Sequence, residues 1–249
     1  MPGKRRALLP LSRPGRTRCA FVVTCEHGGA EIPEAYAALF RGARAALRSH
    51  RGFDLGALPV ARLLSRALEA PLLASTTSRL LVDLNRSEGH PQLLSEWSKQ
   101  ASPAARKAIL EEHYCPHRDA VARAVQKQID SGTRVLHLAV HSFDPSLAKD
   151  RERIALGLLY DPSRSWERTL CSTLQRALQD RVARGQVRRN APYRGANDGL
   201  TRALRRRWPD PDYAGVEIEL NRTWVSTQRG QAHMTEVLVA SLKQLGLAT

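Results

Sequence analysis

Two histidines and a glutamate follow short apolar runs, each where a buried strand is expected to end. His27 follows a run that starts at Phe21, His141 follows one that starts at Leu136, and Glu217 comes after a third. Ligands gather at the carboxyl ends of parallel strands, so these side chains can converge although they are far apart in sequence. Histidines and carboxylates at strand ends are the components of a metal-assisted hydrolase.

Both histidines also have a purely structural interpretation. Gly28 and Gly29 leave the His27 imidazole open to a ligand, but they equally suit a tight turn with a hydrogen-bonded histidine. His141 would need a polar partner if it only filled the core. His137 lies four residues earlier on the same strand face, and we interpret it as structural.

Asp54 precedes a periodic apolar segment, residues 57–70, that predicts a helix. Aspartate is a favoured N-cap residue, so Asp54 could simply begin this helix. A carboxylate at this point is also well placed to bind a metal ion. The local sequence leaves both interpretations open.

Arg79, Asn85 and Arg86 frame an apolar run, residues 80–84, that we interpret as a short strand. The planar fork of a guanidinium binds a carboxylate in bidentate fashion, so these residues are candidates for holding an anionic substrate. The alternative is a solvated basic edge.

His113 and His117 have the i, i+4 spacing of helical metal ligands, but Pro116 lies between them and the H-E-x-x-H pattern is absent. We expect a structural or substrate-edge role for both histidines.

The apolar pattern alternates between strand-like and helix-like segments, which predicts a three-layer α/β/α fold with a mainly parallel sheet. The expected strands are 20–25, 72–75, 80–84, 135–140, 154–160 and 214–220, and the expected helices are 33–40, 57–70, 103–131, 165–183, 200–207 and 228–245. We expect a single domain over 19–249, preceded by a basic, proline-rich tail over 1–18.

The composition favours a cytoplasmic protein without a nucleic-acid partner. The net charge of +15 comes mostly from arginines spread along predicted helices, with one cluster at 202–207. Aromatic residues make up 5%, too few for a base-stacking platform. No apolar stretch reaches the ~20 residues of a membrane span. The 4 cysteines are scattered, as expected of reduced thiols.

The order and combination of these motifs resembles the N-formylglutamate amidohydrolase family over about residues 20–245. The motifs are Cys25-Glu26-His27, residues 54–57, residues 78–86, His141-Ser142-Phe143 and Val216-Glu217-Ile218. The resemblance implies a phosphorylase/hydrolase-like fold, similar to that of zinc carboxypeptidases, aspartoacylase and zinc N-acetylmuramoyl-alanine amidases. It also implies hydrolysis of the N-acyl amide, such as the N-formyl amide, of a small-molecule amino acid derivative.

The resemblance further implies a zinc site. His27 and His141 match the two metal-binding histidines, and the carboxylate ligand of the related amidases falls on Asp54. Glu26 and Glu31 remain alternatives for this third ligand.

Glu217 matches the catalytic glutamate, and Arg79, Asn85 and Arg86 match groups that bind the substrate's carboxylate. Glu219 departs from the family pattern and is an alternative acid–base group. A different function is also open: a non-catalytic binding protein that holds an anionic amino-acid metabolite through its arginines.

Overall fold

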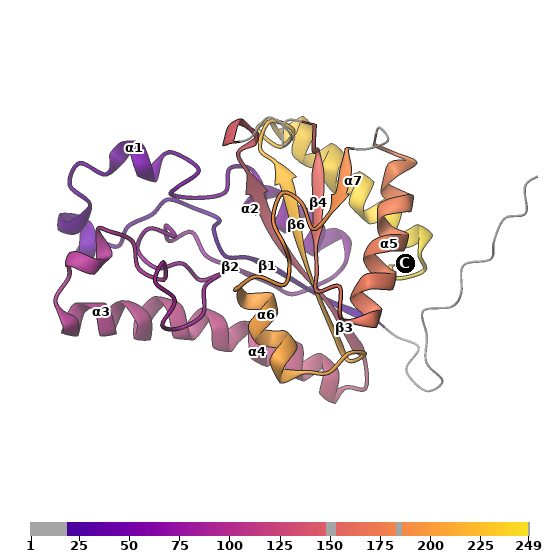
Figure 1. The fold of residues 1–249 in the computed structure, drawn as a ribbon, viewed down its shortest axis with the longest axis horizontal. Helices are drawn as coiled ribbons and strands as arrows, with labels where there is room; N and C mark the ends of the chain where they lie inside the picture. Colours follow the sequence, from indigo (N-terminus) through magenta and orange to yellow (C-terminus); the bar gives the residue numbers. More distant parts are fainter. Residues whose placement is uncertain (1–18, 148–152, 183–185, 249) are drawn as a thin grey trace, which may run out of the picture.

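The computed structural model describes residues 19–147, 153–182 and 186–248. The predicted tail, residues 1–18, lies outside the described residues. The chain folds around one six-stranded sheet with the strand order β2-β1-β3-β6-β4-β5 (Figure 1). The strands are β1 (Cys19–Cys25), β2 (Leu72–Ala74), β3 (Arg134–Phe143), β4 (Leu156–Leu159), β5 (Val187–Arg189) and β6 (Tyr213–Asn221).

The sheet is mixed but mainly parallel. Strands β2, β1, β3 and β6 run in one direction, whereas β4 is antiparallel to β6 and β5 is parallel to β4. The two central strands β3 and β6 are buried along their whole length, as expected of strands covered on both faces.

The strand order reverses next to β1. The chain leaves β1 for the edge strand β2 and then returns to β3 on the other side of β1. Such a switch point opens a crevice at the carboxyl ends of the two strands, where α/β proteins bind their ligands. His27, just after β1, and His141, within β3, lie at this point.

Helices cover both faces of the sheet, which confirms the three-layer prediction. They are α1 (Arg44–Leu47), α2 (Ala57–Ala67), α3 (Pro103–Ile109), α4 (Cys115–Asp130), α5 (Ser165–Gln179), α6 (Leu200–Arg207) and α7 (Gln228–Gln244). The 3-10 turns are η1 (Glu34–Phe40), η2 (Ser98–Gln100) and η4 (Pro145–Leu147). Helices α2, α5 and α7 share a core with one face of the sheet, and α4 and α6 pack on the other.

The stripe predicted for α2 faces the main core. Leu58, Ala61 and Leu64 are buried, and Pro59 lies in the first turn, where its missing N–H leaves no bond unmade. The helix ends at Ala67, three residues earlier than predicted. The chain leaves the helical conformation at Glu69, which has a positive φ of 50°, just before Pro71.

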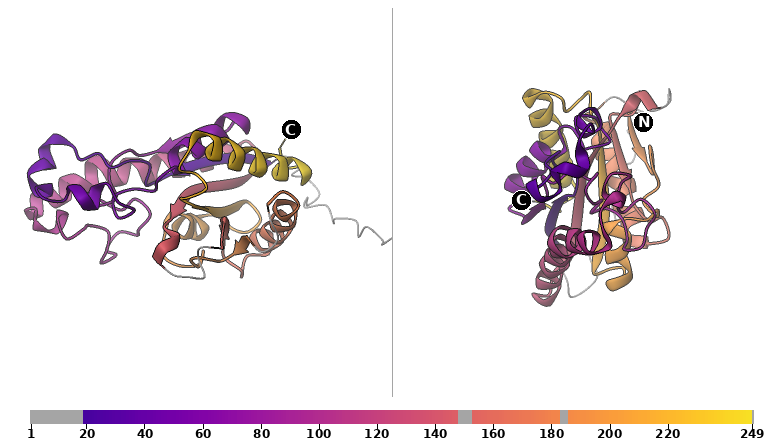
Figure 2. Two further views of the ribbon diagram at one scale, coloured as in Figure 1. Left: turned by 90° about the horizontal axis from the view of Figure 1, so that it is seen from above. Right: turned by 90° about the vertical axis from the view of Figure 1, so that its left-hand side faces the viewer.

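A second hydrophobic cluster lies beside the sheet. It joins the apolar residues of 80–84 to Tyr36, Phe40, Ile109 and Tyr114. Helices α1 and α3 project with it, at the left of Figure 1 and of the view from above in Figure 2.

The strand predicted over 80–84 is wrong. These residues form turns, with Leu81 N bonded to Ser78 O and Arg86 N bonded to Asp83 O. The apolar run is buried by side-chain packing in the second cluster and not within a sheet. The sequence pattern of a short apolar run is the same in both cases, so it cannot distinguish them.

The helical segment predicted over 103–131 is divided near Pro116. A π-helical turn, η3 (Leu110–Tyr114), separates α3 from α4, and Pro116 lies in the first turn of α4. The short strand β5 was not predicted, because two of its three residues are exposed arginines at the sheet edge.

All 4 cysteines are free thiols. Among the described residues, no helix combines the length and apolar character that crossing a membrane requires.

Candidate active site

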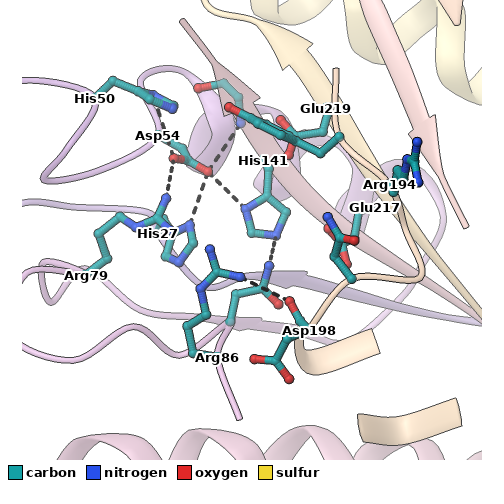
Figure 3. A pocket seen from close by; sticks show the side chains of 14 residues that line it. His27, His50, Asp54, Arg79, Arg86, His141, Arg194, Asp198, Glu217 and Glu219 are labelled. Atoms are coloured by element: carbon teal, nitrogen blue, oxygen red, sulfur yellow. Dashed lines mark hydrogen bonds and ion pairs between the residues drawn. The ribbon is translucent and has the colours of Figure 1, made fainter. Parts of the chain in front are cut away.

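The crevice at the switch point holds a polar cavity of about 200 Å³ (Figure 3). Its lining residues are His27, His50, Asp54, Arg79, Asn85, Arg86, His141, Ser142, Tyr193, Arg194, Asn197, Asp198, Glu217 and Glu219. The structure therefore brings all seven predicted site residues to one cavity.

The strands carry these groups at different points, and only His141 departs from the predicted strand bounds. His27 comes two residues after the end of β1, but His141 lies inside β3, which continues to Phe143. Glu217 and Glu219 lie inside β6, where His141 and Glu219 are partners in the β3–β6 register. The apolar runs end early because the last residues of β3 and β6 direct polar side chains into the cavity.

Asp54 lies at the centre of the cluster. Its Oδ2 is 3.3 Å from His27 Nδ1 and 2.9 Å from His141 Nδ1, and its backbone N–H donates to His27 O at 2.9 Å. Its interpretation as the N-cap of α2 is wrong, because that position is Gly56 at a φ of 81°. A Cβ on Gly56 would lie 2.3 Å from Val225 O, so glycine is required there.

Each histidine has a second carboxylate at its other ring nitrogen. Asp83 Oδ1 lies 2.7 Å from His27 Nε2, and Glu26 Oε2 lies 3.0 Å from His141 Nε2. Glu26 therefore lies behind His141 and outside the converging ligand atoms. Glu31 is exposed and accepts a hydrogen bond from Thr76, so it lies outside the cluster.

Mutual contacts keep the buried cluster charged. Burial raises the pKa of Asp54, but His27 and His141 outweigh burial and hold it well below its usual range. Burial raises the pKa of Asp83 as well, and Arg79 and His27 reverse that effect. Burial lowers the pKa of His141, but Asp54 and Glu26 raise it well above the usual value.

Three atoms of the cluster suit a metal ion. Ligand atoms of His27, Asp54 and His141 all lie within 4.8 Å of one another, and all three side chains are buried. Asp54 Oδ1 is buried without a hydrogen-bond partner. Two imidazoles and a carboxylate are a donor set that zinc favours.

Glu217 and Glu219 face the cavity in different surroundings. Glu217 Oε1 accepts a hydrogen bond from Thr201 Oγ1 at 2.7 Å. Glu219 is buried with its Oε2 unpaired, and burial raises its pKa to about 8. The surroundings of Glu219 thus favour its protonated form.

Arg79 and Arg86 line the cavity through different contacts. Arg79 donates to Asp83 Oδ2 at 2.6 Å and lies 3.7 Å from Asp54 Oδ1. Arg86 donates to Asp198 O at 3.2 Å, and its Nε lies 3.8 Å from Asp83 Oδ2. Arg79 is the more strongly paired of the two.

Asn85 connects the cavity wall to helix α6. Its Oδ1 accepts from Leu200 N at 2.7 Å, and its Nδ2 lies 3.5 Å from His141 Nε2.

His50, which the sequence analysis missed, also lines the cavity, with its Nδ1 3.9 Å from Asp54 Oδ1. The histidines that the sequence analysis interpreted as structural lie outside the ligand atoms. His117 Nε2 is 3.7 Å from Glu26 Oε1, whereas His113 Nε2 is 3.9 Å from Glu112, so the two do not form a pair. His137 is buried between Thr24 and Tyr213, and burial lowers its pKa to about 4.

The sequence analysis missed Asp83 as a partner of His27 and missed the loop that closes the cavity. A signal for Asp83 was present, because a carboxylate inside an apolar run needs a polar partner. The loop residues Tyr193 to Asp198 lie in a segment whose asparagine, glycine and proline content indicates only a loop.

The fold and the polar cavity at its switch point define the chain as an α/β enzyme. The family model of N-formylglutamate amidohydrolase matches residues 19–225, and the chain belongs to this family. It is therefore a hydrolase that acts on amide bonds, as the resemblance predicted.

Solved structures share this fold. A gene product of Agrobacterium tumefaciens is 28% identical, with a TM-score of 0.77 over 90% of this chain and 89% of that chain. An N-formylglutamate amidohydrolase from Ralstonia eutropha JMP134 is 19% identical, with a TM-score of 0.65 over 97% of this chain and 96% of that chain. No curated protein matches the sequence.

Proposed function

We propose that the protein hydrolyses the N-formyl amide of an N-formyl amino acid, such as N-formylglutamate, with a zinc ion held by His27, Asp54 and His141. The observation that carries this proposal is the convergence of three buried ligand atoms at the switch point. Family membership supports the amide bond as the target. When bound, zinc would supply an activated water by lowering the pKa of that water toward about 7.

Glu217 is the general base in this proposal. Its carboxylate takes the proton of the attacking water and returns it to the amine nitrogen that leaves. The hydrogen bond from Thr201 supports this role because it fixes the carboxylate at the cavity wall. Glu219 is the alternative for the second step, since a carboxyl with a pKa of about 8 holds a proton at neutral pH.

Arg86, Arg79 and Asn85 bind the α-carboxylate of the substrate in this proposal. Arg86 is the main contact, because Arg79 is already paired with Asp83 and Asp54. A guanidinium near the scissile bond can also stabilise the developing oxyanion.

Replacing either proposed histidine ligand tests the metal site and the activity together. We expect His27→Ala and His141→Ala to lose both bound zinc and release of formate from N-formyl-L-glutamate, because each removes one of three ligands. Elemental analysis and a formate assay measure the two effects. Full zinc content in both variants would contradict the ligand assignment. A panel of N-formyl and N-acetyl amino acids defines the acyl group.

Replacing Glu217 separates proton transfer from metal binding. We expect Glu217→Gln to keep its zinc but to lose about 10²–10⁴-fold in kcat, the usual contribution of a positioned acid–base group. Glu219→Gln is the matched comparison, two residues along the same strand. If Glu217→Gln retains its rate within a few-fold and Glu219→Gln does not, Glu219 is the base.

A further inference from the structure

Glu26 is a buried carboxylate that the proposed chemistry does not use. It lies between β1 and His27, and its side chain is fully shielded from solvent. Its Oε1 and Oε2 form no hydrogen bond of regular geometry, yet they face the ring nitrogens of His117 and His141. A buried charge is costly unless it is paired, so the two histidines are the groups that compensate Glu26.

We infer that Glu26 is a positioning residue that selects the tautomer of His141 and presents its Nδ1 to the metal ion. This inference rests on the proposed zinc site and adds a residue that is not itself a ligand.

The contact at His141 Nε2 supports the choice of tautomer. A neutral imidazole carries a proton on one nitrogen and a lone pair on the other, and an ionised carboxylate can only accept. Both ring nitrogens of His141 face a carboxylate, since Asp54 Oδ2 lies 2.9 Å from Nδ1 and Glu26 Oε2 lies 3.0 Å from Nε2. Asp54 is a proposed ligand and Glu26 is not, so a zinc ion held by Asp54 would take the lone pair of Nδ1, and the proton would stay on Nε2, where Glu26 accepts it.

Asn85 is the competing group at the same nitrogen. Its Nδ2 would donate to an unprotonated Nε2, but it is neutral and lies at 3.5 Å, farther away than Glu26. A carboxylate behind a ligating histidine also raises the basicity of that ligand, which strengthens its bond to the metal.

Helix α4 holds Glu26 from the other side. His117 Nε2 lies 3.7 Å from Glu26 Oε1, one turn after the π-helical turn. On the same helix face, Tyr114 Oη and Arg118 donate to the carbonyl oxygen of Arg86. The start of α4 therefore contacts both the metal cluster and the segment that carries Arg86, and Glu26 is its link to the cluster.

The test is the zinc affinity of the full chain, measured by competition with a chromophoric chelator. We expect Glu26→Ala to weaken zinc binding by about 10–100-fold, the usual effect of losing a partner behind a metal ligand. Glu26→Gln should recover part of that loss, because its amide oxygen can still accept from Nε2. The control is Glu31→Ala, which removes a carboxylate from the same segment after β1; Glu31 is exposed and lies outside the cluster, so its loss should leave the zinc affinity unchanged.

A second measurement uses the unaltered protein and does not depend on how the variants fold. In zinc-loaded protein, ¹⁵N NMR of the histidine rings should show His141 with a protonated Nε2 and a metal-bound Nδ1. A metal-bound Nε2 would overturn the inference, as would Glu26→Ala with the zinc affinity of the unaltered protein. Absence of zinc binding by the unaltered protein would overturn the proposed function as well.

Discussion

At the scale of single residues, Glu219 is an acid whose surroundings oppose its charge. Its pKa rises from 4.5 to about 8, chiefly through burial, and Asp54 and Glu217 act in the same direction. A carboxyl group with a raised folded-state pKa stabilises the fold fully only below its unfolded pKa of 4.5. That contribution is lost as the pH rises from 4.5 toward 8.

We therefore expect Glu219→Gln to raise the Tm of the metal-free protein at pH 8 and to leave it nearly unchanged at pH 4.5. The amide carries no charge, so the variant avoids burying an anion at the higher pH. Thermal unfolding followed by circular dichroism at the two pH values measures the difference. An equal shift at both pH values would mean that Glu219 is not destabilised by its charge.

Residue-level partners are also where sequence reasoning reached its limit. His27 and His141 were predicted because each follows an apolar run, and Asp54 because it precedes a periodic helical segment. Glu26 was considered only as a possible ligand, and its position behind His141 depends on how β1 packs beside β3. Such a pairing across more than a hundred residues has no local signal.

At the scale of elements, the turn Asp83–Arg86 carries much of the cavity wall. Asn85 N donates to Asp83 Oδ1 at 3.0 Å, and Arg86 N donates to Asp83 O at 3.1 Å. Tyr114 Oη holds the end of the turn at the carbonyl of Arg86, at 2.9 Å. These hydrogen bonds hold the backbone from which the Arg86 side chain enters the cavity.

We expect Arg86→Lys to lower kcat/KM for N-formyl-L-glutamate about tenfold or more. A point charge cannot reproduce a bidentate contact, and a charge-assisted hydrogen bond contributes about 1.5–3 kcal/mol. The loss should nearly vanish for a substrate whose α-carboxylate is amidated. Steady-state kinetics on both substrates decides the matter, because equal losses would assign Arg86 to the fold and not to the ligand.

Elements with a strong period were predictable and the weak ones were not. Helix α2 and strand β1 follow the apolar pattern, because the helix buries one face and the strand is buried from Phe21 to Cys25. The strand prediction for 80–84 fails because the sequence cannot reveal the second hydrophobic cluster that buries this run. Strand β5 has only three residues and pairs through its backbone, so its side chains carry no pattern.

At the scale of the whole molecule, the basic charge of the chain is partly structural. The predicted arginine cluster at 202–207 is divided, because Arg205 points inward and pairs with the buried Glu167 at 2.9 Å. Arg205 also donates to Gly195 O and Gly215 O, which ties α6 to the cavity loop and to β6. The charge of this arginine therefore stabilises the walls of the site.

The cavity itself joins two parts of the molecule. The switch point of the sheet supplies His27, His141 and Glu217, while the segment beside the second cluster supplies Arg79 and Arg86. Ser87 and Arg86 bind Asp198 across the opening and so connect this segment to the loop that follows β5. The motifs in the sequence predict His27, His141 and Glu217. The contacts of Asp198 with Arg86 and Ser87 have no such signal, because they form only once the whole chain has folded.

The most direct test of the account is to titrate zinc into protein stripped by a chelator while following formate release from N-formyl-L-glutamate. We predict that the stripped protein is inactive and that its activity rises linearly until one zinc ion is bound per chain. Full activity in protein shown by elemental analysis to be metal-free would contradict the account.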